Sequence, residues 1–181
     1  MHSVRYVAFL RGINSGKNPP LKMDVLKKAF EDLGYENVRT VIASGNVIFD
    51  APTDVVNLDP VVLEQEIEFA LPKVIDFKTE AFVCTLSDLQ DLINKNPFQD
   101  IDLTAQKKAY VTFIKHGARV PLKFPYTGDG FILLENFHSM VCSIVDFSTS
   151  NSPSLMKVLD KELGKGNTTR GWSTIAKIVG V

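Results

Sequence analysis

The sequence is poor in cysteine and histidine, the residues from which disulfide frameworks and structural metal sites are built. Two cysteines and three histidines occur in 181 residues. Cys84 and Cys142 each lie inside a strand-like apolar run, AFVCT and MVCSIV, where a thiol usually packs as a small hydrophobic group. The three histidines are scattered and show no metal-ligand spacing: His2, His116 and His138. The sequence therefore predicts neither a metal site nor a disulfide scaffold.

Long apolar runs are also missing. No stretch approaches the roughly 20 apolar residues that cross a bilayer. The apolar run near the amino terminus reaches Arg11 too early to be a signal peptide. The composition, 45% hydrophobic and 23% charged, is that of an ordered globular chain. We therefore expect a cytoplasmic protein with no membrane partner.

A global excess of basic residues, which marks many nucleic-acid-binding domains, is absent because the formal net charge is −1. Residues 1–95 carry 10 basic and 14 acidic side chains, and residues 96–181 carry 10 and 7. This mild asymmetry is more typical of ordinary surface charge than of a clustered binding surface. Motifs of the Walker, dinucleotide-binding, G-x-S-x-G and H-E-x-x-H types are absent too. These absences make an enzyme less expected, but they leave the question open. No cofactor is indicated by the sequence.

Apolar patterning in the first half predicts the order β-α-β-β-α-β. Apolar stripes at helical spacing begin at Met23 and, after the capping pair Asp59-Pro60, at Leu63. The expected strands are residues 4–10, 38–43, 46–50 and 79–85. This order is that of the ferredoxin-like arrangement, in which two helices cover one face of a four-stranded antiparallel sheet. Tyr6, Phe9 and Phe49 are expected in the core.

The second half predicts a helix near 87–95, strands at 107–115, 131–135 and 140–147, a helix at 153–163 and a short final helix. The fold class is therefore α+β, with antiparallel sheets and helices on one face of each. We expect two subdomains, a ferredoxin-like one at 1–85 and a related second one at 86–181 that packs against it.

The most suggestive segment is a polar loop, RGINSGKN, that follows the first strand. Because a right-handed crossover makes the first two strands parallel, this loop is expected beside the turn SGN and the start of the first helix. Unpaired N–H groups and the helix dipole favour an anion there, and an arginine adds a planar donor fork. The predicted ligand-binding residues are Arg11, Gly12, Asn14, Lys17, Ser44, Gly45 and Asn46. Glycine and asparagine are common in loops for conformational reasons as well, and Arg11 has an alternative role as a partner of Asp24 or another carboxylate.

A second polar cluster, NTTRGW, precedes the final helix. Thr168 or Thr169 is expected to cap that helix. Alternatively, Arg170 and Trp172 bind a phosphate or stack on a base. Thr168, Thr169, Arg170 and Trp172 are therefore also counted among the predicted ligand-binding residues. If this segment folds back onto the first loop, Arg11 and Arg170 would converge on one pocket.

The motifs YVAFLRGIN, KMDVLKKAFEDLGYENVRT, SGNVIF and TTRGW, in this order, resemble the bacterial domain-of-unknown-function family DUF1697 over nearly the whole chain. The resemblance implies an α+β fold with ferredoxin-like halves and implies no established activity. Two positions depart from the family pattern. Lys17 stands where members have a second glycine after RGIN, and Gly171 stands where members have asparagine.

Three hypotheses follow from these features. The leading one is a module that binds an anion, a nucleotide or a nucleic acid at the RGIN loop and the SGN turn. The second is an enzyme that acts on a phosphorylated small molecule, with Arg11 or Arg170 as a charge clamp. The third is a protein-interaction domain. The oligomeric state is not indicated by the sequence.

Overall fold

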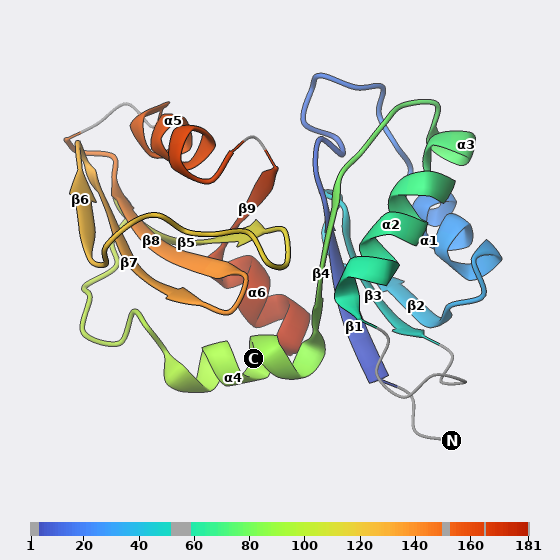
Figure 1. Ribbon diagram of the computed structural model, residues 1–181, viewed down its shortest axis with the longest axis horizontal. Helices are drawn as coiled ribbons and strands as arrows, with labels where there is room; N and C mark the ends of the chain where they lie inside the picture. Colours follow the sequence, from blue (N-terminus) through green and yellow to red (C-terminus); the bar gives the residue numbers. More distant parts are fainter. Residues whose placement is uncertain (1–3, 52–58, 150–152, 165, 181) are drawn as a thin grey trace. The chain divides into compact units, whose positions relative to one another are not determined.

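The chain folds into two compact units, Met1–Leu89 and Gln90–Val181 (Figure 1). The computed structural model describes residues 4–51, 59–149, 153–164 and 166–180. Each unit contains one antiparallel sheet and its helices, so the predicted α+β class is confirmed. The division falls inside α4 (Leu86–Lys95), slightly beyond the expected boundary between residues 85 and 86. None of the helices in the described ranges is long and apolar enough to cross a membrane.

Unit 1 has the predicted β-α-β-β-α-β order with one short additional helix. Its strands lie in the order β2-β3-β1-β4, and every neighbouring pair is antiparallel. This is the ferredoxin-like sheet. The elements are β1 (Val4–Leu10), α1 (Met23–Asp32), β2 (Glu36–Thr40), β3 (Asn46–Ala51), α2 (Pro60–Ala70), α3 (Pro72–Ile75) and β4 (Ala81–Thr85).

The strand predicted at residues 38–43 is the least accurate prediction in this unit. Strand β2 ends at Thr40, and residues 41–45 form the connection to β3. The apolar letters Val-Ile-Ala suggested a longer strand, but Ile42 has a left-handed φ of 59° and an exposed side chain. Left-handed backbone cannot continue a strand, so the connection is longer than the expected tight hairpin.

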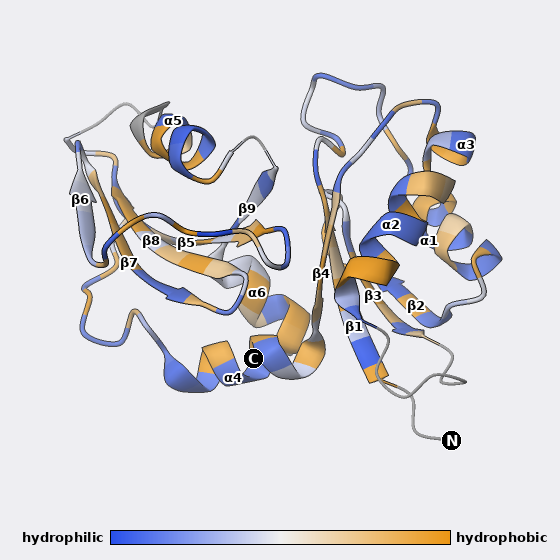
Figure 2. Cartoon of the chain, in the orientation of Figure 1, coloured by the Kyte–Doolittle hydropathy of each residue, from blue (hydrophilic) through white to orange (hydrophobic). Residues whose placement is uncertain are grey.

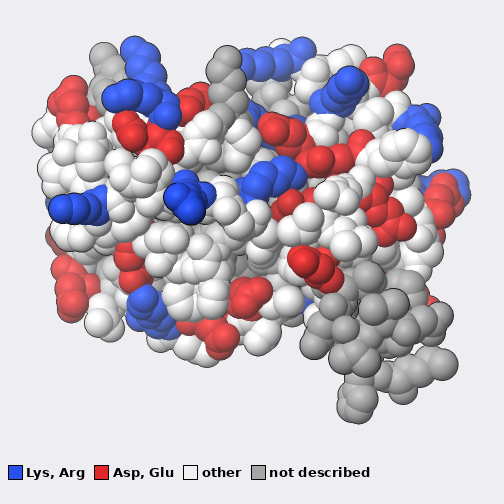
Figure 3. Space-filling model, viewed as in Figure 1, with Lys and Arg blue, Asp and Glu red and all other residues white. Residues whose placement is uncertain are grey.

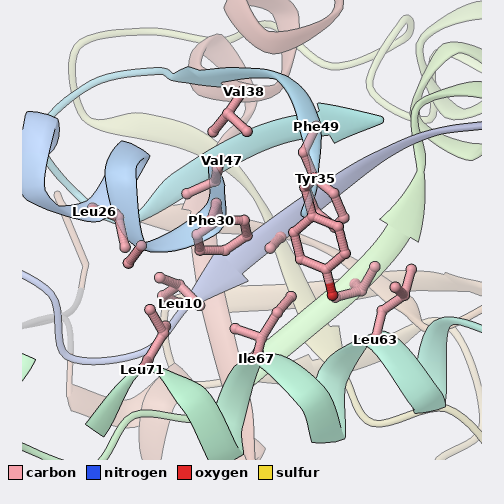
Figure 4. Close-up of a cluster of buried hydrophobic side chains, with 14 of the residues drawn as sticks. Leu10, Leu26, Phe30, Tyr35, Val38, Val47, Phe49, Leu63, Ile67 and Leu71 are labelled. Atoms are coloured by element: carbon pink, nitrogen blue, oxygen red, sulfur yellow. The ribbon is translucent and has the colours of Figure 1, made fainter. Parts of the chain in front are cut away.

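The core of unit 1 is aromatic and lies between the sheet and the helices α1 and α2 (Figure 4). The rings of Tyr35 and Phe49 lie 4.5 Å apart, and those of Phe30 and Phe49 lie 5.4 Å apart with an edge-to-face tilt. Tyr6, Phe9 and Phe49 are all buried, as predicted. Strand β4 is hydrophobic along most of its length (Figure 2). Burial of such side chains stabilises a fold by about 1.5–3 kcal/mol each.

Two glutamates of α2 cover the outer edge of β4. The carboxylate of Glu68 accepts a hydrogen bond from the backbone N–H of Ala81 at 2.8 Å, and that of Glu64 accepts one from Val83 at 3.0 Å. Edge strands otherwise present these donors to passing chains. The spacing of four residues places both carboxylates on one helix face, so α2 satisfies alternate donors of the strand beside it.

Unit 2 contains a sheet with the strand order β6-β7-β8-β5-β9. Under α5, side chains of β7 and β8 form a core with Leu155 and Leu159. The elements after α4 are β5 (Lys107–Ile114), β6 (Tyr126–Gly128), β7 (Phe131–Phe137), β8 (Met140–Asp146), α5 (Pro153–Glu162), β9 (Asn167–Gly171) and α6 (Trp172–Val179).

Two strands of unit 2, β6 and β9, were not predicted from the sequence. Residues 167–171 were expected to open the last helix, but they form the edge strand β9, which pairs antiparallel with β5. The segment NTTRG contains no apolar residue, so no alternating pattern revealed it. Helix α6 begins at Trp172 behind Gly171 and has no side-chain cap, so the expected capping by Thr168 or Thr169 is wrong. Strand β6 is only three residues long and follows Pro125.

An ion pair joins β1 to β3 at the sheet end opposite the polar loop. Arg5 donates to Asp50 through two nitrogens, at 2.7 and 2.9 Å, and Asn37 donates to the same carboxylate at 2.7 Å. The hydrogen bonds from Arg5 hold the pKa of Asp50 below its ordinary value, although burial acts in the opposite direction. Asp50 is therefore an anion in the folded protein at neutral pH.

We predict that Asp50→Asn lowers the free energy of unfolding by about 1–2 kcal/mol at pH 7, since a charged hydrogen-bonded pair is lost. Because the folded-state pKa is depressed, the stabilisation is present above the unfolded pKa, about 3.9, and is lost as pH falls through the folded value. Urea unfolding from pH 7 to pH 3 should thus show the two proteins converging at low pH. The exposed control Asp91→Asn should change stability by less than about 0.5 kcal/mol. A difference that is independent of pH would contradict this assignment.

Candidate functional site

The polar loop after β1 and the connection between β2 and β3 are joined by hydrogen bonds. Strand β1 pairs with β3 so that Phe9 lies opposite Asn46, and the backbone N–H of Leu10 donates to the carbonyl of Gly45 at 2.8 Å. The side chain of Asn14 donates to the carbonyl of Ala43 at 3.0 Å. The expected proximity of the RGIN loop and the SGN turn is therefore present in the structure.

The loop holds its shape through its own asparagines. Asn14 accepts from the backbone N–H of Leu21 at 2.7 Å and donates to the carbonyl of the same residue at 3.0 Å. Asn18 donates to the carbonyl of Gly12 at 3.1 Å. Gly12, Asn14 and Gly16 all have left-handed φ angles, which glycine and asparagine adopt most easily. The loop is thus a preformed scaffold.

The SGN turn packs against the polar loop. Asn46 is fully buried, and its amide donates to the carbonyl of Val41 at 2.9 Å and to the hydroxyl of Ser44 at 3.0 Å. Gly45 has a φ of 77° and lies against Ile13 and Leu10. Ser44, Gly45 and Asn46 were predicted to contact a ligand. The structure places the Asn46 amide inside the turn, and none of the three lines either of the two hollows described next.

The first hollow, here named the α1 hollow, has a volume of about 620 Å³ and lies between the polar loop and the start of α1. Lys22 precedes the helix, whose first turn has no side-chain cap. The described residues of the lining include one basic side chain and no carboxylate: Asn14, Gly16, Asn18, Pro20, Leu21, Lys22 and Ala43. Its surroundings favour an anion, because the positive end of the α1 dipole lies there and no side chain caps the first turn.

The second hollow, here named the Arg11 hollow, has a volume of about 520 Å³ on the other side of the loop. Thr79 donates to the carbonyl of Arg11 at 2.7 Å, and the N–H of Arg11 donates to the carbonyl of Glu80 at 2.9 Å. The lining mixes both signs of charge: Arg11, Gly12, Asn18, Glu68, Pro72, Lys78, Thr79 and Glu80. Asn18 lines both hollows, so they adjoin.

Arg11 forms an ion pair, but its partner is Glu80 at 3.3 Å and not Asp24. The alternative that Arg11 pairs with another carboxylate is therefore correct. Lys22, Lys78 and Glu80 were not among the predicted site residues. Topology offered a signal for the last two, since β4 runs antiparallel to β1 and must begin where β1 ends.

Three lysines around the polar loop have no carboxylate partner among the residues that the structure describes. In the described ranges, no ion pair involves Lys17, Lys22 or Lys78. On α1, by contrast, Lys27 lies 3.7 Å from Glu31 and Lys28 lies 2.9 Å from Asp32. Among the described residues, Lys27 and Lys28 of α1 are thus paired with carboxylates, whereas Lys17, Lys22 and Lys78 near the loop are not.

The second predicted cluster belongs to unit 2 and is largely engaged within it. Arg170 donates to the hydroxyl of Thr168 at 2.7 Å, and burial lowers the pKa of its guanidinium to about 10. The hydroxyl of Thr169 lies 2.9 Å from that of Thr112. The ring of Trp172 lies 5.0 Å from that of Phe98 in an edge-to-face arrangement. Because Arg11 and Arg170 belong to different units, their convergence stays a prediction.

Comparisons with known proteins add a family and a fold. A family model described as a protein of unknown function, DUF1697, matches residues 4–122. Among solved structures, the chain resembles the conserved bacterial protein SP0830 from Streptococcus pneumoniae, with a TM-score of 0.73 and 22% sequence identity over 98% of both chains. At that identity the likeness shows the fold alone. No curated protein matches the sequence.

Gly45 and Gly16 form a matched pair for testing how tightly the turn is built. An alanine at Gly45 would place its Cβ 2.8 Å from Cγ1 of Ile13 and 3.1 Å from Cβ of Leu10, whereas one at Gly16 meets nothing within 4 Å. Both positions have a left-handed φ, which costs about 1–2 kcal/mol for alanine. Overpacking at Gly45 adds about 1–3 kcal/mol.

We predict that Gly45→Ala lowers the free energy of unfolding by about 2–4 kcal/mol and that Gly16→Ala lowers it by about 1 kcal/mol. Urea denaturation of the two variants and the wild type measures the difference. Equal losses would show that the contact of Gly45 with Ile13 does not constrain the turn.

Proposed function

Because the chain belongs to DUF1697, a family of unknown function, we propose its function from the site itself: unit 1 binds a phosphate-bearing small molecule in the α1 hollow. The observation that carries this proposal is a preformed hollow whose described lining contains a lysine and no acidic residue; within the described residues that lysine, Lys22, has no carboxylate partner. An anionic group can enter without displacing a counter-ion.

The donors for such a group come from one short stretch of chain. Lys22 supplies an ammonium group, and the backbone N–H groups of the first turn of α1 have no side-chain cap. Lys17, exposed on the same loop, adds long-range attraction. Each charge near a helix terminus contributes about 0.3–1 kcal/mol, so the predicted affinity for inorganic phosphate alone is weak. The remainder of the ligand must supply further contacts.

The size and charge of the site favour a small molecule over a nucleic acid. Pockets for small ligands typically have volumes of about 300–1,000 Å³, and the α1 hollow falls in that range. On the face of unit 1 that Figure 3 shows, basic and acidic side chains are interspersed and form no continuous basic stripe. A nucleic acid needs such a stripe to release the counterions of its backbone. The compartment that we propose is the cytoplasm.

The lining also favours binding over acid–base catalysis. General acid–base chemistry needs a titratable side chain within hydrogen-bond reach of the reacting group. Among the described residues that line the α1 hollow, Lys22 is the only one with a titratable side chain. We therefore rank an enzymatic function on phosphorylated small molecules second and a protein-interaction function third.

Lys22→Gln should weaken the binding of inorganic phosphate and of AMP by about five- to tenfold in isothermal titration calorimetry, because the ammonium group is removed while the side-chain length is nearly kept. The control is Lys27→Gln on the same helix, where the lysine pairs with Glu31. This control should bind as the wild type does and lose at most about 0.5 kcal/mol of stability.

Asp24→Asn tests the sign of the effect. Asp24 lies in the first turn of α1, is exposed, and does not line the hollow. Removing its negative charge should strengthen phosphate binding by a small factor, about two- to threefold, and more at low than at high ionic strength. The proposal fails if phosphate and AMP do not bind, or if Lys22→Gln and Lys27→Gln weaken binding equally.

A further inference from the structure

In the described part of unit 1, two arginines form ion pairs with carboxylates, and these pairs differ in geometry and exposure. Arg5 binds Asp50 through two nitrogens at 2.7 and 2.9 Å, and the carboxylate side chain is 4% exposed. Arg11 meets Glu80 through one nitrogen at 3.3 Å, and the Glu80 side chain is 45% exposed. Exposed pairs with a single long contact contribute little to stability. The second pair can therefore open without harm to the fold.

The backbone of Arg11, unlike its side chain, is fixed. Thr79 and Glu80 hold it on both sides through the hydrogen bonds given above. The guanidinium consequently stays at the Arg11 hollow whether or not it contacts Glu80. A guanidinium prefers bidentate oxygen acceptors, and the single contact to Glu80 leaves that preference unmet.

Lys78 provides a second cation at the same hollow. It is exposed, lines the hollow with Arg11, and has no carboxylate partner in the part of the chain that the structure describes. Glu68, the other acidic lining residue, accepts the N–H of Ala81 with one of its oxygens. The hollow thus holds two cations and two carboxylates: Glu68 accepts a backbone N–H, and Glu80 is held by an exposed and weak ion pair.

We propose that the Arg11 hollow binds an anionic group between Arg11 and Lys78. In the absence of this group, Glu80 forms an ion pair with the guanidinium of Arg11, and the group displaces Glu80 when it binds. Since the α1 hollow lies on the other side of Asn18, the two sites together would take one ligand with two separated anionic groups. This ligand class, a bisphosphate or a phosphorylated carboxylic acid, rests on the function proposed above. The anion site beside Arg11 does not.

Site-resolved titration with inorganic phosphate tests the two hollows separately. In ¹H–¹⁵N spectra, the amides of Gly16 and Lys22 report on the α1 hollow, and those of Gly12 and Lys78 report on the Arg11 hollow. Sodium chloride at matched ionic strength is the control for salt effects. We expect both pairs of amides to shift with phosphate and to saturate at different concentrations.

Substitutions then separate the two sites. Lys78→Gln should remove the response of Gly12 and leave that of Gly16, whereas Lys22→Gln should do the reverse. Glu80→Gln should lower the phosphate dissociation constant at the Arg11 hollow about three- to tenfold, because the competing charge is removed. Lys78 is exposed and makes no ion pair in the described ranges, so Lys78→Gln is expected to fold even if Glu80→Gln does not.

Each outcome decides between the proposals. Shifts at Gly16 and Lys22 alone would overturn the anion site beside Arg11 and keep the proposed function. Shifts at Gly12 and Lys78 alone would overturn the proposed function and keep the anion site. No shift at either pair would overturn both. A Glu80→Gln variant that binds phosphate no better than the wild type would overturn the role of Glu80.

Ligand spacing tests whether one molecule spans both hollows. In a series of linear alkane α,ω-bisphosphonates with two to six carbons, only the distance between the anionic groups changes, and alkylphosphonates of matched length carry a single anionic group. We expect one bisphosphonate to bind at least tenfold more tightly than its matched alkylphosphonate. Lys22→Gln and Lys78→Gln should each reduce that advantage. A series without a preferred length would overturn the two-anion ligand.

Discussion

The central position of β1 in the first sheet is the constraint on which the rest of unit 1 depends. Because β1 pairs with β3 on one side and with β4 on the other, the end of β1 meets both the end of the β2–β3 connection and the start of β4. Two backbone hydrogen bonds continue these pairings into the loop: Leu10 donates to Gly45 and Arg11 donates to Glu80. Three segments that are distant in sequence therefore converge at one end of the sheet, where β1 ends. The two hollows lie on either side of the loop that follows β1.

Polar side chains at this end of the sheet divide into two groups with different physical roles. The amides of Asn14, Asn18 and Asn46 donate to backbone carbonyls and so fix the conformation of the loop and the turn. The lysines are not needed for that purpose, since no carboxylate pairs with Lys17, Lys22 or Lys78 in the described residues. Asparagine builds the scaffold, and the basic side chains remain available for an anionic ligand. Residue type alone did not separate these roles, because both kinds of side chain looked equally polar in the sequence.

Apolar patterning predicts only those elements whose side chains are buried, and this explains which parts of the fold the sequence predicted. Apolar patterning revealed α1, which buries one stripe, and β1, a continuous apolar run whose residues are buried from Tyr6 to Leu10, and with them the order of elements in unit 1. Strand β9 has no apolar residue and is formed by backbone pairing with β5, so periodicity could not reveal it. The proximity of the loop to Gly45 was predictable from crossover handedness. The partner of Arg11 depends on side-chain geometry at the start of β4, which neither spacing nor composition specifies.

The two departures from the family pattern show which positions the backbone leaves free to vary. Lys17 stands where the resemblance implies glycine, yet it is not among the non-glycine residues with positive φ, so its backbone needs no glycine. Its neighbour Gly16, with a φ of 81°, does have a left-handed backbone. Gly171, which stands where the resemblance implies asparagine, has a φ of −66°, and a Cβ there would approach only Ser173, at 3.9 Å. A side chain fits at both positions without backbone strain. The lysine therefore adds a positive charge at the loop while the scaffold that positions the α1 hollow is unchanged.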